Sequence, residues 1–145
     1  MQKVTPFLWF DGQAEAAAKF YTSIFKESEI VRLGESSAIF RLGAVEFIAF
    51  NGGPHFQFSP AISLFVRCET QEEIDYYWDG LAAGGEKQSC GWLKDRFGVS
   101  WQIIPPILGE MLNDDDETRA QRVFQAMLAM GKIEIALLEQ AYAGP

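Results

Sequence analysis

The residue type best suited to acid-base or metal chemistry occurs once in this chain, as His55 in the segment NGGPHFQFS. An imidazole can bind a metal ion or exchange a proton near neutral pH, but catalysis also needs a partner group that orients it or takes the proton. The sequence identifies no such partner. Gly52, Gly53 and Pro54 predict a turn before the histidine. His55 is therefore either a structural or solvent-facing loop residue, or a loop residue that contacts a ligand.

The two cysteines are the next residues that could do chemistry. Cys68 and Cys90 lie in neither a CxxC motif nor a zinc-type spacing, and without an export signal both are expected to be reduced. Cys90, in the segment SCGW, would act as a nucleophile only if a base or a helix N-terminus lowered the pKa of its thiol. The sequence shows neither, which favours a buried structural cysteine.

Motifs for several other chemistries do not occur in the sequence. It contains no GxSxG elbow of a serine hydrolase, no glycine-rich phosphate loop, and no strand followed by a GxGxG-type turn that could hold a methyl donor. The run NDDDE lacks the glycine and the distal glutamate of a calcium-binding EF-hand loop. We interpret that run as the N-terminal cap of a helix.

Composition and charge limit the classes of partner. The chain has 145 residues, of which 48% are hydrophobic, enough for one globular domain with a core of its own. A formal charge of −8 opposes binding to nucleic acid and is neutral or favourable towards cationic ligands. The longest apolar run is too short for a membrane helix, and the first residues do not resemble a signal peptide. We expect a cytoplasmic protein that binds neither nucleic acid nor membrane.

The elements that must position these residues recur in the same order. Residues 1–52 predict a strand around VTPFLWF, an amphipathic helix, and strands at EIVRLG, SAIFRLG and AVEFIAF. Residues 60–105 predict the strand AISLFV, a helix QEEIDYYWDGLAA capped by Thr70, and strands in EKQSC, GWLKD and VSWQIIP. A shift of about 55 positions superposes Tyr21 on Tyr76 and Gly43 on Gly98. The chain is therefore predicted to contain two tandem βαβββ units.

Residues 106–145 predict helices only. The acidic run would cap the first clear helix, Gly131 would end it, and KIEIALLEQAY would form the next one. The predicted buried stripe of the first helix consists of Ala120, Val123, Phe124, Met127 and Met130.

Three long stretches carry a family resemblance: TPFLWFDGQAEAAAKFYTSIF, GGPHFQFSPAISLFVRCETQEEID and CGWLKDRFGVSWQIIP. They resemble the vicinal oxygen chelate superfamily, also known for its glyoxalase and bleomycin-resistance members, and within it the PhnB-like branch labelled demethylubiquinone methyltransferase-like. The resemblance implies an α+β fold in which two tandem βαβββ units form a cupped eight-stranded mixed sheet, with a C-terminal helical extension. It also implies a single glyoxalase-like domain over residues 1–145 and a homodimer.

Metal-dependent members of that superfamily bind one divalent ion through residues on the first and last strand of each unit. By the resemblance, the corresponding positions here fall near Thr5 or Pro6, and at Phe47, Ala61 and Gln102. One neutral amide cannot replace the hydration shell of such an ion. We therefore predict no metal and no cofactor. A register slipped by one residue would turn Glu46 and Trp101 inward instead.

The inward positions would leave a largely aromatic hollow, suited to a small aromatic or cationic molecule. The predicted pocket residues are Phe7, Trp9, Phe47, His55, Trp92, Trp101 and Gln102. The preferred function is a metal-independent small-molecule binding protein. Two alternatives stay open: a metal-dependent lyase or oxidoreductase that uses Gln102 with His55 or Glu46, and a protein with a plugged core that acts through dimer or partner contacts.

Overall fold

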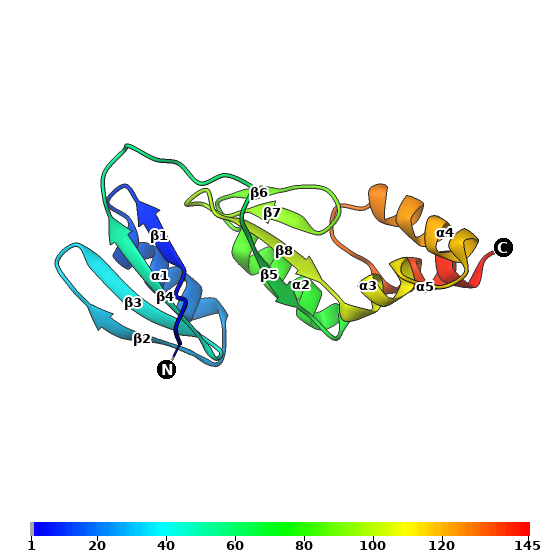
Figure 1. Ribbon diagram of the computed structural model, residues 1–145, viewed down its shortest axis with the longest axis horizontal. Coiled ribbons are helices and arrows are strands. Elements are labelled where there is room, and N and C mark those ends of the chain that lie inside the picture. Colours follow the sequence, from blue (N-terminus) through cyan, green and yellow to red (C-terminus); the bar gives the residue numbers. More distant parts are fainter. Residues whose placement is uncertain (1) are drawn as a thin grey trace. The chain divides into compact units, whose positions relative to one another are not determined.

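The computed structural model describes residues 2–145 and shows an α+β protein with two four-stranded mixed sheets (Figure 1). Along the described part of the chain, one helix lies between the first and the second strand of each sheet, and three further helices follow the second sheet. The predicted tandem βαβββ order and the C-terminal helical extension are confirmed. The chain divides into two compact units, the first ending at Ser59 and the second beginning at Pro60. No helix within residues 2–145 is long and apolar enough to cross a membrane.

The first unit is a sheet with the strand order β1-β4-β3-β2, in which β1 and β4 are parallel and the other pairs antiparallel. A two-residue turn at Gly43 joins β3 to β4, and Gly43 has the positive φ of 60° that such hairpins favour. The elements are β1 (Phe7–Phe10), α1 (Ala14–Ile24), β2 (Ser28–Leu33), β3 (Ser37–Leu42) and β4 (Val45–Asn51).

Helix α1 covers one face of the first sheet. Small residues on the helix, Ala14, Ala17 and Ala18, are fully buried and let it lie close to the strands. The side chain of Asn51 in β4 accepts a hydrogen bond of 2.8 Å from the Ala14 amide, which caps the helix start where Gln13 provides no side-chain cap. A strand residue therefore fixes where α1 begins.

The second unit repeats this plan with the strand order β5-β8-β7-β6. Thr70 caps α2 as predicted, since its hydroxyl accepts a hydrogen bond of 3.2 Å from the Glu73 amide. The buried side of α2, with Ile74 and Leu81, packs on the sheet side that carries Leu93. The elements are β5 (Ser63–Arg67), α2 (Gln71–Ala82), β6 (Glu86–Lys87), β7 (Trp92–Lys94) and β8 (Ser100–Ile104).

The C-terminal extension comprises α3 (Pro106–Leu112), α4 (Glu117–Leu128) and α5 (Ile135–Ala143). The predicted acidic cap is confirmed: a carboxylate oxygen of Asp116 accepts hydrogen bonds of 3.0 and 3.2 Å from the amides of Thr118 and Arg119. The prediction of a buried stripe is wrong at Phe124, which is 39% exposed. Phe124 does not belong to the apolar core that contains Val123 and Met130. The extension shares one apolar core with Ile104, the last residue of β8.

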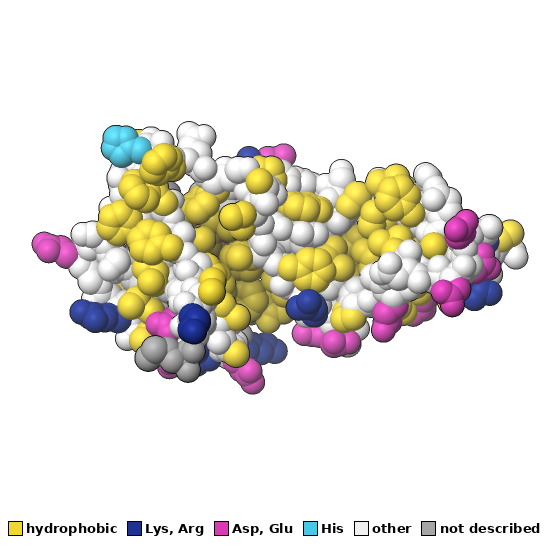
Figure 2. Space-filling model, viewed as in Figure 1, with side chains coloured by type: hydrophobic (Ala, Val, Ile, Leu, Met, Phe, Trp, Pro, Cys, Tyr) yellow, Lys and Arg dark blue, Asp and Glu magenta, His cyan; other side chains and the backbone are white. Residues whose placement is uncertain are grey.

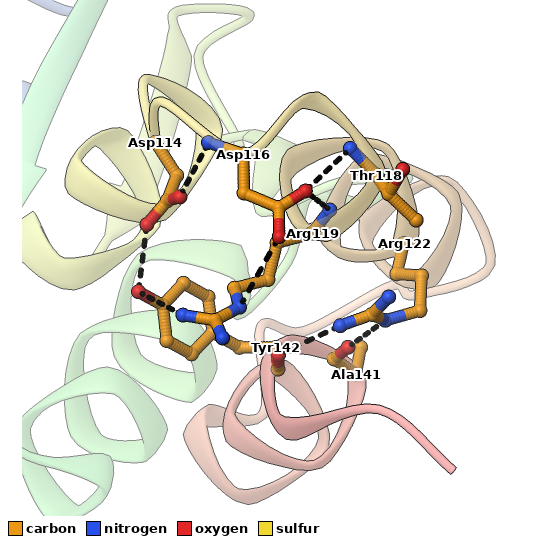
Figure 3. A network of polar contacts seen from close by, with 7 residues as sticks. All are labelled: Asp114, Asp116, Thr118, Arg119, Arg122, Ala141 and Tyr142. Carbon is orange, nitrogen blue, oxygen red and sulfur yellow. Dashed lines mark hydrogen bonds and ion pairs between the residues drawn. The ribbon is translucent and has the colours of Figure 1, made fainter.

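Polar contacts join α4 to α5 (Figure 3). The Tyr142 hydroxyl donates to a carboxylate oxygen of Asp114 at 2.6 Å, and the Arg119 guanidinium lies 4.9 Å from the centre of the Tyr142 ring. The Arg122 guanidinium donates to the backbone oxygens of Ala141 and Tyr142, at 2.8 and 3.0 Å. These last carbonyls of α5 have no partner within the helix, so Arg122 serves as its C-terminal cap.

We expect Tyr142→Phe to lower stability in a pH-dependent way. The hydrogen bond from Tyr142, followed by that from the Asp116 amide, lowers the pKa of Asp114 below its ordinary value of 3.8. A lowered carboxyl pKa adds stability above the ordinary value, and that stability is lost as pH falls through the folded-state pKa. Urea unfolding should therefore show a wild-type advantage at about pH 7 that shrinks below about pH 4. An advantage that does not change with pH would contradict this role for Asp114.

Candidate functional site

Each sheet has one face covered by its own helix and one face that this helix leaves open, here called the open face. In the second sheet Leu93, Trp101 and Ile103 point to the α2 side and are at most 2% exposed. Strand alternation places the intervening residues on the open face. Phe65 of β5, Gln102 of β8 and Trp92 of β7 are register partners there, so they form one row across three strands.

The open face of the second sheet and the C-terminal extension enclose a groove of about 660 Å³, here called the second-sheet groove. This volume lies in the range of small-molecule sites. Figure 2 shows apolar side chains on this face of the second unit. The sheet side of the groove is lined by Phe65, Arg67, Trp92 and Gln102. The helical side is lined by residues that include Leu108, Glu110, Leu112 and Met127.

The sheet side of the groove is here called its floor, and two side chains give this floor its polar character. The Gln102 amide nitrogen donates to the Ser63 hydroxyl at 2.9 Å, which fixes the amide and leaves its oxygen able to accept a hydrogen bond from a ligand. The Arg67 guanidinium lies 5.4 Å from the centre of the Phe65 ring and makes no ion pair within the described part of the chain. The floor can thus offer a ring surface, an amide oxygen and a cation.

The cysteines have different surroundings. Cys68 is fully buried, and desolvation, with the nearby charges of Glu73 and Glu69, raises the pKa of its thiol to about 12. The thiol therefore stays protonated at neutral pH, and Cys68 is a core residue. Cys90 is half-buried, lines the second-sheet groove and has an unusual positive φ of 59°. Its backbone amide donates to the Met130 oxygen at 2.8 Å, a bond between the sheet and the extension that holds this conformation.

The open face of the first sheet is aromatic. Phe7 is 55% exposed there, and its ring centre lies 5.5 Å from that of Phe50. The Trp9 ring contacts Phe50 and Phe56 at 5.3 and 4.9 Å, and its indole nitrogen donates to the Gly53 oxygen at 3.0 Å. Phe7 and Trp9 therefore lie on an open face, as Trp92 and Gln102 do in the second unit.

The structure corrects the positions expected for Phe47 and Trp101. Phe47 is 6% exposed and stacks on Phe40, with ring centres 5.1 Å apart, on the α1 side of its sheet. Trp101 is 2% exposed, and its indole nitrogen donates to a carboxylate oxygen of Asp95 at 2.8 Å. Both aromatic rings are core residues of their own units and do not reach an open face.

The two hairpins explain why the expected register is right in one unit and wrong in the other. In the first unit the pair that closes the hairpin, Leu42 and Val45, lies on the helix side, so Phe47 does too. In the second unit the closing pair, Lys94 and Ser100, lies on the open side, so Gln102 does too. The slipped register, with Glu46 on the open face, is thus correct for the first sheet alone.

His55 lies in the connection after β4 and is exposed (cyan in Figure 2). The part of the chain that the structure describes provides it with no hydrogen bond or ion pair. Its surroundings match the solvent-facing interpretation and supply no group that would orient it as a base.

The residues present do not fit the metal that the fold family implies. Thr5 and Pro6 precede β1, Ala61 is exposed in a turn before β5, Phe47 is in the core, and the Gln102 amide is bonded to Ser63. Among residues 2–145, no three side chains of His, Cys, Asp or Glu come close enough together to hold a metal ion. Zinc, iron and manganese sites depend on such ligands.

Comparison with known proteins gives a consistent result. The family model for 3-demethylubiquinone-9 3-methyltransferase matches residues 2–104. The structure of a putative 3-demethylubiquinone-9 3-methyltransferase, a PhnB protein from Bacillus cereus, is 41% identical, with a TM-score of 0.64 over 72% of this chain and 99% of that chain. No curated protein sequence matches.

Two further structures share the fold at lower identity. Protein PA1353 from Pseudomonas aeruginosa is 19% identical, with a TM-score of 0.60 over 72% of this chain and 98% of that chain. A glyoxalase/bleomycin resistance protein from Albidiferax ferrireducens T118 is also 19% identical, with a TM-score of 0.50 over 69% of this chain and 96% of that chain.

Proposed function

The chain belongs to the 3-demethylubiquinone-9 3-methyltransferase family, of glyoxalase/bleomycin-resistance fold, and from this premise we propose that it binds a small aromatic molecule without a metal. The row formed by Phe65, Gln102 and Trp92 on the floor of the second-sheet groove carries this proposal. The two rings offer surface for stacking or edge contacts, and the amide offers one directional hydrogen bond. We propose binding in place of methyl transfer because no strand in the sequence leads into a glycine-rich turn for a methyl donor.

The residues of the groove favour a ligand charge that differs from what the net charge alone suggests. The Arg67 guanidinium lies 5.4 Å from the Phe65 ring, beside the row of groove residues that carries the proposal, whereas Glu110 lines the groove from α3; both side chains are exposed. A carboxylate on the ligand could form a charge-assisted hydrogen bond with Arg67. An aromatic carboxylate is therefore preferred to an aromatic cation, despite the formal charge of −8.

Binding can be tested with naphthalene compounds that share the ring system and carry substituents of opposite charge. Titration of 1-naphthoate should give a saturable change in tryptophan fluorescence that disappears in Trp92→Phe, whereas 1-naphthylmethylammonium should bind more weakly. Arg67→Gln should weaken naphthoate binding about 5- to 10-fold, equivalent to about 1 to 1.4 kcal/mol. Glu110→Gln should have a smaller effect in the opposite direction.

Lys94→Gln is the matched control for Arg67→Gln. Lys94 lies on the same open face and its change removes the same charge, but it does not line the groove. Naphthoate affinity should stay within about twofold of wild type in this variant. The proposed function would be rejected if none of the naphthalene compounds gave saturable binding, or if the signal were unchanged in Trp92→Phe.

We also propose that the protein is cytoplasmic and that it is a homodimer, the latter as the resemblance implies. Phe7 and Phe56 are 55% and 66% exposed, and apolar surface of this kind is commonly covered by a partner. Light scattering during size-exclusion chromatography should give about twice the 16.3 kDa chain mass.

A further inference from the structure

The resemblance implies a C-terminal helical extension, but the family match does not reach these helices. The match to the family model ends at residue 104, immediately before the Pro105 that precedes α3. The Bacillus cereus protein is matched over 99% of its length by 72% of this chain, so it has no counterpart for the remainder. These helices therefore lie outside the part of this chain that the family model and the Bacillus cereus protein match.

The extension is attached to α2 and to the segment before β7 at several independent points. The amides of Cys90 and Gly91 donate to the backbone oxygens of Met130 and Gly131, both at 2.8 Å. The Gln71 side chain at the start of α2 donates to the Ile133 oxygen at 3.0 Å and accepts from the Ile135 amide at 2.8 Å. The latter bond caps α5, whose own Glu134 provides no side-chain cap. Lys132 adds an ion pair of 2.8 Å with Asp75.

These attachments bring apolar side chains of the extension to the second-sheet groove. Leu112 of α3 and Met127 of α4 line this groove together with the residues of its sheet side. Met127 is half-buried and packs against the core of the extension, so its position is set by that core. A methionine wall can adapt to ligands of different shape, but it still limits their size.

We propose that the extension is the specificity element of this site, and that Met127 limits the size of the planar aromatic ligand that the second-sheet groove accepts. This inference rests on the proposed function, because it concerns the same groove. Its physical basis is that the sheet alone offers an open surface, while the helices turn that surface into a groove with a second wall. A ligand held between two walls loses more of its surface to the protein than a ligand lying on one.

The test compares a two-ring with a three-ring aromatic carboxylate, 1-naphthoate and 9-anthroate, in wild type and Met127→Ala. Shortening Met127 should weaken naphthoate binding about 3- to 10-fold, because a wall contact is lost. It should weaken anthroate binding less or strengthen it, so that the ratio of the two affinities changes at least about fivefold. Far-ultraviolet circular dichroism and thermal unfolding should show that the variant remains folded.

Leu128→Ala is the matched control, since Leu128 is the next residue on α4, is 48% exposed and does not line the groove. The ratio of naphthoate affinity to anthroate affinity in Leu128→Ala should equal that of wild type. If Met127→Ala does not fold, Met127→Ile, which changes the shape of the side chain more than its volume, should still alter the ratio. A ratio equal to that of Leu128→Ala in every folded Met127 variant would overturn the inference. Failure of both compounds to bind wild type would instead reject the proposed function.

Discussion

Asp95→Ala is expected to lower the free energy of unfolding by about 3 to 5 kcal/mol. The Asp95 carboxylate is 2% exposed and accepts hydrogen bonds from the amides of Phe97 and Val99, at 2.8 and 3.0 Å, and from the Trp101 indole at 2.8 Å. Truncation would remove the acceptor of all three hydrogen bonds, and each buried donor that is left unsatisfied costs about 1 to 3 kcal/mol. Denaturant unfolding monitored by circular dichroism measures the loss.

Two further variants separate the parts of this effect. In Asp95→Asn the side-chain oxygen can still accept from the Phe97 and Val99 amides, but the NH2 group would face the Trp101 N–H, which is also a donor. We therefore expect this variant to lower the free energy of unfolding by about 1 to 3 kcal/mol. Combining it with Trp101→Phe should cost less than the sum of the single changes, because the opposing donor is gone. Asp11→Ala, at an exposed position, should change stability by less than about 0.5 kcal/mol. A loss below about 1 kcal/mol for Asp95→Ala would show that water replaces the carboxylate.

Gly91→Ala is expected to cost about 3 kcal/mol and to loosen the attachment of the extension. Gly91 has a φ of 81°, and a Cβ there would lie 2.7 Å from Ile104 Cδ1 and 2.9 Å from Ile133 Cγ1. These side chains belong to the core shared by β8 and the extension. The Gly91 amide also makes one of the bonds to the α4–α5 connection. The cost therefore combines backbone strain with overpacking of that core.

Gly43→Ala is the control that measures the cost of a positive φ without the cost of overpacking. Gly43 has a similar φ of 60°, but a Cβ there would have no neighbour within 4 Å, so we expect a loss of about 1 to 2 kcal/mol. Hydrogen exchange should report faster exchange of α4 and α5 amides in Gly91→Ala but not in Gly43→Ala. Equal losses in the two variants, with unchanged exchange in the extension, would mean that the Gly91 contact relaxes at no cost.

Sequence patterns predict only some of the residues that line the site. They predict Trp92 and Gln102 near a ligand, and both line the second-sheet groove, but the same patterns do not mark Phe65, Arg67 and Met127 as groove residues. Phe65 and Arg67 alternate on β5 with Leu64 and Val66, a pattern that predicts two faces without telling which one is open. Met127 was placed in a buried stripe by its helical spacing, and half-buried side chains of that kind can also line a groove.

The sequence by itself determined the tandem βαβββ order, the helix caps at Thr70 and within the acidic run, and the helical nature of the tail, because these depend on neighbours a few residues away. The tertiary structure decided which way Phe47 and Trp101 face, since a strand residue changes sides with the conformation of the hairpin before it. It also decided that Asp95 is a buried acceptor and that the extension forms a groove wall, because those contacts join residues that no local pattern relates.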